Sequence, residues 1–274
     1  MTHDLISCLM VALPVAKRFN FLVHSIADYR RQSYPHRELV IVLDQGEPAC
    51  VDAIERHVTE LGDPSIRVIQ PTGKRTLGAL RNQSIQFSTG AILCQWDDDD
   101  LYHPGRLTLQ FQALEHANSD AVFLQDVALF FPAQRDLYCT NWRATPAGCF
   151  PATLMCRRST PILYPEDGPE AERGEDTAVA QQLLARCSVH LMAGSPHLHV
   201  YVAHGNNTWP ESFHRMLRDT LAMSRALLLR REAALRQGLA EIDFGSDAVA
   251  VQGNNGAAFV LGTGSVDGVR QPVP

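Results

Sequence analysis

The sequence lacks long apolar stretches and any excess of basic charge. Its longest apolar runs fall far below the roughly 18 residues that suggest a membrane-spanning helix. The start, Met1-Thr2-His3-Asp4, has neither the basic segment nor the apolar stretch of a secretory signal. Lys and Arg number 24 against 30 Asp and Glu, which gives a formal net charge of −6. Without a basic field to displace counterions, we expect no nucleic-acid partner.

The sequence also lacks the marks of a disulfide scaffold or a repeat protein. Its seven cysteines are an odd number, and no two form a Cys-x-x-Cys motif. Most lie in apolar segments, where a free cysteine behaves as a small hydrophobic residue. With 45% hydrophobic and 20% charged residues, the chain has the composition of a globular protein. We therefore expect a reduced, cytoplasmic protein without a transmembrane segment, and leave attachment to a membrane surface open.

What the first part of the sequence contains is a regular alternation of two patterns. Continuous apolar runs predict buried strands over residues 6–13, 39–43, 66–69 and 91–96. Between them, apolar residues recur at helical spacing over residues 19–32, 51–61 and 77–87. Strands that alternate with helices in this way are typical of an α/β protein with a parallel sheet and crossover helices.

The alternation weakens after Pro104. The pattern predicts a helix there, another over residues 176–187 and a long one that begins near Thr208 and reaches Gln237. Short strands are predicted over residues 121–124, 127–131, 153–156, 189–192 and 198–202. Residues 238–274 hold 7 of the 18 glycines, so we predict a flexible tail. Two short apolar pieces, 248–251 and 259–261, leave a docked strand as the alternative.

Four consecutive aspartates, Asp97 to Asp100, directly follow the predicted strand 91–96. Adjacent carboxylates repel one another, so such a run is costly unless a cation neutralises it. In extended geometry Asp97 and Asp99 would face the same side, and carboxylate oxygens suit Mg²⁺ or Mn²⁺. The alternative is a solvated acidic loop in which Asp99 or Asp100 caps the following helix. Asp44 also follows a predicted strand, and α/β sheets bind ligands beyond the carboxyl ends of their strands.

The segment 91–104, AILCQWDDDDLYHP, resembles the Asp-x-Asp region of the family 2 glycosyltransferases. Residues 32–44, 77–82 and Gly174-Glu175-Asp176 resemble further pieces of that family in the same order. The resemblance covers about residues 5–215. It implies a GT-A fold, with a Rossmann-like, mostly parallel central sheet, flanking helices and a smaller acceptor-side subregion. The implied domain is 1–237, with a donor half of about 1–104 and an acceptor half of about 105–237.

The resemblance also implies roles on the donor side, for a nucleotide-diphospho-sugar. Asp44 would contact the nucleobase, although a turn-forming Asp before Gln45-Gly46 is the alternative. Arg81 and Asn82 would lie near the ribose and phosphates, and Arg81 has alternatives as a surface residue or as an ion-pair partner of the aspartates. Asp97 and Asp98 would contact the donor. The implied ligands of Mn²⁺ or Mg²⁺ are Asp99, Asp97 and His204, and His204 has a structural loop residue as its alternative.

On the acceptor side, the resemblance assigns Asp176 as the base that deprotonates an acceptor hydroxyl, with Glu175 beside it in contact with the acceptor. The alternative is that both residues only favour the start of a helix through its dipole. The residues Trp142, Cys149, Phe150 and Tyr164 lie where the acceptor would sit, and would either stack on a sugar ring or pack in the core. The sequence does not identify the acceptor.

The implied function is therefore an inverting, metal-assisted glycosyltransferase. A UDP-sugar is favoured as donor, but Leu43 and residues 12–16 depart from the family pattern at the base pocket, which leaves the nucleotide open. One rival is a metal-dependent nucleotidyltransferase, which should carry a glycine-rich, lysine-containing loop after the first strand. Residues 14–18, PVAKR, are not glycine-rich. The other rival is a non-catalytic nucleotide-sugar-binding protein, and the intact Glu175-Asp176 pair argues against it.

Overall fold

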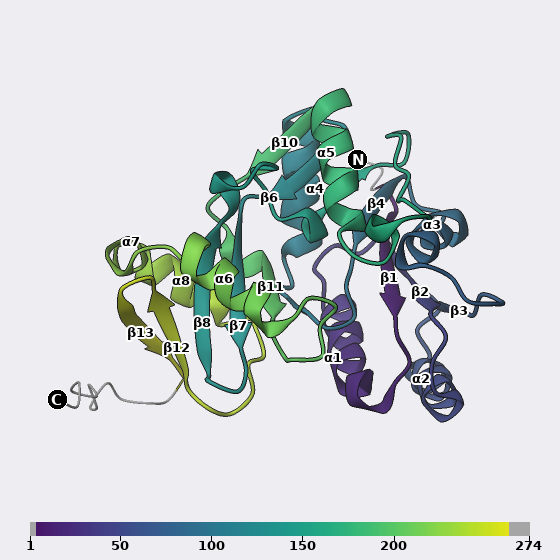
Figure 1. Ribbon diagram of the computed structural model, residues 1–274, viewed down its shortest axis with the longest axis horizontal. Helices are drawn as coiled ribbons and strands as arrows, with labels where there is room; N and C mark the ends of the chain where they lie inside the picture. Colours follow the sequence, from purple (N-terminus) through teal and green to yellow (C-terminus); the bar gives the residue numbers. More distant parts are fainter. Residues whose placement is uncertain (1–3, 263–274) are drawn as a thin grey trace.

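A computed structural model of the chain describes residues 4–262 and contains two sheets with helices packed around them (Figure 1). Sheet A has the strand order β10-β6-β9-β4-β1-β2-β3, and its pairs are parallel except for those of β9. This is the mostly parallel central sheet that the alternation of strands and helices predicts. The bounds of its strands are β1 Ile6–Ala12, β2 Arg37–Leu43, β3 Ile66–Ile69, β4 Ile92–Gln95, β6 Ala121–Leu124, β9 Met155–Arg157 and β10 Val189–Met192.

Alternate side chains of the strands of sheet A point to opposite sides. Because these side chains are apolar on both faces, helices cover both. Met10 and Ile41 face one core, which is covered by α1 Phe19–Arg30, α2 Pro48–Leu61 and α4 Arg106–His116. Leu9 and Val40 face the other side, where α3 Leu77–Phe87 and α5 Glu175–Arg186 pack. Strands buried on both faces read as continuous apolar runs, which is why the sequence located them well.

Sheet B has the order β13-β12-β8-β7-β11-β5 and mixed directions. It lies on the opposite side of Figure 1 from β1, β2 and β3. Its strands are β5 Leu101–Tyr102, β7 Asp126–Phe131, β8 Asp136–Asn141, β11 His199–Val202, β12 Val249–Gly253 and β13 Gly256–Leu261. In the described chain the short 3-10 helices are η1 Ala16–Arg18, η2 Trp142–Ala144, η3 Pro151–Thr153, η4 Pro169–Ala171 and η5 Pro196–Leu198.

The aspartate run is the segment by which the chain crosses from one sheet to the other. It follows β4 of sheet A and leads into β5 of sheet B, with a turn at Asp98 and Asp99. The extended geometry that the sequence suggested for these residues is therefore wrong. Because β1 pairs with both β2 and β4 in parallel, the carboxyl ends of all three strands meet at one edge of sheet A.

The long helix predicted up to Gln237 is three helices, α6 Glu211–Leu221, α7 Arg225–Arg230 and α8 Glu232–Leu239. The first break lies where the chain touches β8: the N–H of Met223 donates to the carbonyl of Cys139, at 2.8 Å. Ser224 then caps α7 by accepting from the N–H of Leu227. A tertiary contact with a strand far away in the sequence thus overrides the helical periodicity.

The predicted flexible tail is also corrected, for the part of it that the structure describes. Strands β12 and β13 form a hairpin, and β12 pairs in parallel with β8. Val249, Val251 and Phe259 are buried in the core of sheet B together with Leu239 and Ile242. The apolar pieces that the sequence left as a possible docked strand are these strands. Residues 263–274 of the predicted tail lie outside the described residues.

Between residues 4 and 262, none of the helices combines the length and the apolar character that crossing a membrane requires.

Candidate active site

A cavity of about 460 Å³ opens where β1, β2 and β4 end. Most of the residues predicted for the site line it, and they come from both halves of the sequence. They are Asp44, Arg81, Asp97, Asp98, Asp99, Glu175 and Asp176. The structure thus brings the predicted donor-side and acceptor-side carboxylates into one cavity.

Arg81 joins the two sides of this cavity. Its Nε donates to Glu175 Oε1 at 2.7 Å, and one of its terminal nitrogens donates to Asp97 Oδ1 at 3.1 Å. Burial opposes the charge, but Asp97 and Glu175 together hold the pKa of Arg81 well above its usual value. The sequence left Arg81 as a donor contact, a surface residue or an ion-pair partner of the aspartates. The structure shows the ion pair with Asp97, and Arg81 also lines the cavity.

Two glycines bring these groups together. A Cβ on Gly78 would lie 1.8 Å from the carbonyl oxygen of Pro165, so only glycine lets α3 approach that loop closely enough to present Arg81. Gly174 has a φ of 86° and directly precedes α5. This left-handed residue turns the chain so that Glu175 and Asp176 begin the helix.

Asp176 lies in the first turn of α5, and its Oδ1 accepts from the N–H of Thr177 at 2.6 Å. Burial and then the neighbouring Glu175 raise the pKa of Asp176 to about 7. A carboxyl with a pKa near neutrality is ionised in about half of the molecules at that pH and accepts a proton more readily than an ordinary aspartate. The side chain is suited to general-base work.

The four aspartates have different partners, in two groups. Asp98 and Asp99 face Arg18, whose NH2 lies 2.7 Å from Asp98 Oδ1 and 2.9 Å from Asp99 Oδ2. His204 Nε2 also lies 2.9 Å from Asp99 Oδ2. Burial raises the pKa of Asp98 to about 7, whereas the pKa of Asp99 is lowered: the bond to His204 and the charge of Arg18 outweigh its burial.

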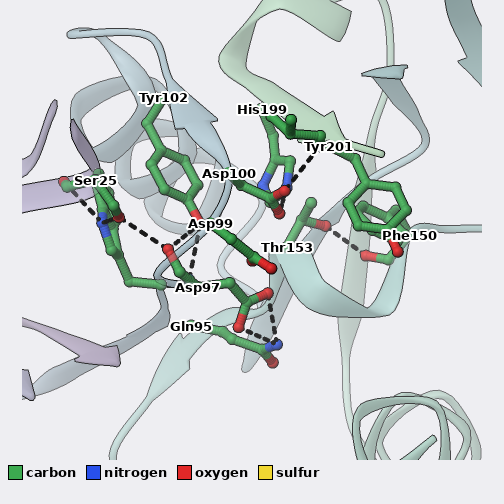
Figure 2. A network of polar contacts seen from close by, with 12 residues as sticks. Ser25, Gln95, Asp97, Asp99, Asp100, Tyr102, Phe150, Thr153, His199 and Tyr201 are labelled. Atoms are coloured by element: carbon green, nitrogen blue, oxygen red, sulfur yellow. Dashed lines mark hydrogen bonds and ion pairs between the residues drawn. The ribbon is translucent and has the colours of Figure 1, made fainter. Parts of the chain in front are cut away.

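Asp97 and Asp100 are turned away from that pair. Figure 2 shows Asp97 turned towards Gln95 and Asp100 turned towards His199. Asp100 Oδ2 lies 2.8 Å from His199 Nε2, with both side chains almost wholly buried, and Asp100 Oδ1 accepts from the N–H of Val202. Asp100 thereby fastens β11 to the turn, which is a structural role rather than the helix cap that the sequence allowed.

Asp98, Asp99 and His204 provide atoms that suit a divalent cation, although Arg18 contacts both aspartates in this structure. Carboxylate oxygens and an imidazole nitrogen suit Mn²⁺, and Asp99 and His204 do meet. Among the residues that the structure describes, one buried oxygen of Asp98 has no hydrogen-bond partner, as expected for a carboxylate that binds a ligand. Asp97, the third predicted ligand, is paired with Arg81. Within the described residues, no three His, Cys, Asp or Glu side chains are arranged to hold a metal ion.

Asp44 and Asn82 differ in where they lie. Asp44 is half-buried at the cavity wall, and its Oδ1 also accepts from the N–H of Gln45, so it both forms a turn and faces the cavity. Asn82 does not line the cavity. Its side chain donates to the carbonyl of Tyr164 and to Glu166, and accepts from the N–H of Tyr164, so it supports that loop.

The wall opposite sheet A is aromatic. Trp142 and Phe150 line the cavity as buried side chains, whereas Cys149 and Tyr164 belong to the core behind it. Trp209 is half-buried at the cavity, and its ring stacks on that of Phe213 with centroids 4.4 Å apart.

Sequence reasoning missed Arg18 and Trp209 as site residues. The signal for Arg18 was available, because it follows the first strand just as the aspartates follow the fourth, and these strands are neighbours in the sheet. Trp209 follows His204 in a loop between a strand and a helix, and only the tertiary structure shows that this loop reaches the cavity.

The comparisons with known proteins concern the family and the fold. Residues 10–131 match the family model described as glycosyl transferase family 2. Over 99 residues the chain is 30% identical to the putative colanic acid biosynthesis glycosyl transferase WcaA of Escherichia coli K12. That match covers 36% of this chain and 35% of the length of the relative.

Solved structures resemble most of the chain in fold, at low sequence identity. S. aureus TarS in complex with UDP matches with a TM-score of 0.56 and 13% identity, over 85% of this chain and 75% of that one. The mannosyltransferase PcManGT from Pyrobaculum calidifontis, in complex with GDP-Man and Mn²⁺, matches with a TM-score of 0.54 and 15% identity, over 88% of this chain and 64% of that one. Residues 10–131 are therefore similar to the glycosyl transferase family 2, and the chain has the GT-A fold.

Proposed function

We propose that this chain is an inverting glycosyltransferase that moves a sugar from a nucleotide-diphospho-sugar to an acceptor hydroxyl. The observation that carries the proposal is the bridge by Arg81 between Asp97 on the donor side and Glu175 on the acceptor side. The bridge fixes the donor wall and the start of α5 relative to each other across one cavity. Fixed geometry between two reactants is a major source of catalysis.

On the donor side, Asp44 contacts the nucleobase, and Arg81, Asp97 and Asp98 line the region of the ribose and diphosphate. Asp99 and His204 would hold a divalent cation, Mn²⁺ or Mg²⁺, which would supply positive charge for the departing diphosphate. Asp97, a predicted third ligand, would have to leave Arg81 to join them. TarS with UDP and with UDP-GlcNAc and PcManGT with GDP-Man support a nucleotide-sugar donor, with UDP favoured and the base open.

On the acceptor side, Asp176 takes the proton of the acceptor hydroxyl as that oxygen attacks the anomeric carbon. The bond from this carbon to the diphosphate breaks on the opposite face, so the configuration inverts. Glu175, held by Arg81, remains beside the base and contacts the acceptor. The raised pKa of Asp176 supports its role as the proton acceptor.

The experiment is a transfer assay with a panel of nucleotide-sugars and Mn²⁺, preceded by a thermal-shift screen for the donor. Release of the nucleoside diphosphate with transfer to an added acceptor is the expected result, and NMR of the product should show the inverted anomer. In a parallel assay with a nucleoside triphosphate and a sugar 1-phosphate, release of pyrophosphate would establish the nucleotidyltransferase instead. Donor binding with no turnover on any acceptor or water would favour the non-catalytic binding protein.

Metal dependence is tested by calorimetry with UDP and Mn²⁺. Chelator should remove binding, and Asp99→Ala should abolish the metal-dependent part. Binding of UDP with equal strength with and without Mn²⁺ would contradict the metal assignment. The transfer reaction is tested separately, by the transfer assay.

A further inference from the structure

Arg18 is a buried cation bound to the same carboxylates that the proposed metal needs. Its NH2 contacts Asp98 Oδ1 and Asp99 Oδ2, and its NH1 donates to the carbonyl of Asn206 at 2.9 Å. Only about 12% of its side chain is exposed. Arg18 thus links the loop after β1, the aspartate turn and the loop that carries His204.

Arg18 in this position leaves no room for a divalent cation on Asp99 Oδ2. Asp99 Oδ2 already has contacts to both Arg18 and His204. A metal ion bound by that oxygen at about 2 Å would lie against the guanidinium. Two cations a few ångströms apart in a buried site repel each other strongly, and an arginine does not lose its charge in a protein.

Within the part of the chain that the structure describes, the ion pair of Arg18 and Asp98 leaves one polar atom of each residue without a hydrogen bond. Among the described residues, Arg18 Nε is buried without a partner, and so is Asp98 Oδ2. A guanidinium with an unused buried donor is ready to bind an anion, and a carboxylate with an unused buried oxygen is ready to bind a cation. A diphosphate with its metal supplies one of each.

We propose that Arg18 is a resident cation that competes with the divalent metal for Asp98 and Asp99, and that it moves to the diphosphate when metal and donor bind together. The inference rests on the proposed donor and metal site. Its consequence is cooperative binding: the metal alone binds weakly because it must displace Arg18, and the nucleotide diphosphate offers the displaced guanidinium a new partner. The nucleotide diphosphate thus raises the affinity for the metal. Linkage then requires that the metal raise the affinity for the nucleotide by the same factor.

The test measures the affinity of the full chain for Mn²⁺ alone, from the EPR signal of the free ion, in the native protein, Arg18→Gln and Arg18→Lys. We expect Arg18→Gln to bind Mn²⁺ about tenfold more tightly than the native protein, within the usual range of coupling between sites. Arg18→Lys, which keeps the charge, should bind about as weakly as the native protein.

The matched control is Arg67→Gln, which removes one charge and one ion pair, with Glu38, outside the cavity. It should leave Mn²⁺ affinity within twofold of the native value. If Arg18 only supported the loops around it, Arg18→Gln would loosen the site and bind Mn²⁺ equally or less tightly, which would overturn the proposal. No detectable Mn²⁺ binding to either protein would overturn it as well.

Adding UDP separates this inference from the proposed function. UDP should raise the Mn²⁺ affinity of the native protein by a larger factor than that of Arg18→Gln, and an equal factor in both would contradict the transfer of Arg18 to the diphosphate. If no nucleotide or nucleotide-sugar bound to either protein, the glycosyltransferase proposal would fail, while competition between Arg18 and Mn²⁺ would still be decided by the metal alone.

Discussion

The two walls of the cavity are built in different ways. The wall of sheet A and α5 consists of carboxylates paired with Arg18 and Arg81. The wall of sheet B and its following loops is aromatic, with Trp142, Phe150 and Trp209. Charged groups that are held by ion pairs suit a charged donor and proton transfer, whereas rings suit the apolar faces of an acceptor. We therefore expect substitutions on the two walls to affect different steps.

The aspartate run contains the same contrast within four residues. Asp99 contacts Arg18 and His204, whereas the side chain of the next residue, Asp100, is buried against His199 of β11. Because the run crosses from sheet A to sheet B, adjacent and chemically identical side chains serve the site and the fold. Five predictions test this contrast, in order of decreasing effect.

Deleting residues 238–274 should abolish the cooperative folding of the sheet B side. The deletion removes the hairpin and its buried apolar side chains, each of which contributes about 1.5–3 kcal/mol. These include Leu239, Ile242, Val249, Val251 and Phe259. Their sum is comparable to the total stability of a typical domain, about 5–15 kcal/mol. Chemical denaturation followed by circular dichroism measures the effect.

A matched pair of point variants tests the same hairpin without a deletion. Val251→Asp places a charge in the core, and Ala257→Asp places it on the exposed side of the neighbouring strand. The first should destabilise by several kcal/mol and the second by about 0.5 kcal/mol or less. Equal melting temperatures for the two would show that the hairpin is not docked.

Asp176→Asn should lower kcat by about 10²–10⁴-fold, since general-base catalysis contributes that much. Donor binding should persist. In the native protein, the pKa of about 7 means that Asp176 is protonated below neutrality and ionised above it. The rate should therefore fall about tenfold for each pH unit below 7 and level off above it. Glu170→Gln, an exposed carboxylate outside the cavity, is the control, and a wild-type pH profile in Asp176→Asn would exclude the base.

Asp100→Ala should lower the free energy of unfolding by about 2–4 kcal/mol, because it leaves His199 Nε2 and the N–H of Val202 buried without an acceptor. Asp99→Ala should change stability by less and remove metal-dependent donor binding instead. Urea denaturation and UDP titration of both variants make the comparison. A larger loss of stability in Asp99→Ala than in Asp100→Ala would reverse the assignment.

Trp209→Ala should raise the KM for the acceptor about tenfold, the equivalent of about 1–1.5 kcal/mol of lost aromatic contact. The KM for the donor should not change, since Trp209 lies on the aromatic wall. Trp209→Phe should recover most of the loss, because a ring remains to stack. Steady-state kinetics with each substrate varied in turn separates the two values, and an effect on the donor alone would contradict the division between the walls.

The parallel strands of sheet A and the places of its carboxylates at strand ends were predictable, and most of sheet B was not. Strands such as β1 and β2 are buried on both faces, so they read as unbroken apolar runs with a polar residue at the end. Strand β8 carries buried and half-buried residues in irregular order and was not predicted. The hairpin β12–β13 is short and rich in glycine, and its burial depends on pairing with β8, more than 100 residues earlier in the sequence.

Local patterns in the sequence were enough to predict the alternating α/β pattern, the sheet of parallel strands and the positions of Asp44, Asp97–Asp100 and Glu175–Asp176 at element ends. These depend on local periodicity and on the order of elements along the chain. The folded structure was needed to show which aspartate contacts Arg81, Arg18 or His199, where the last long helix breaks, and that the hairpin docks. Each of these outcomes depends on contacts between residues far apart in the sequence, and no local pattern contains that information.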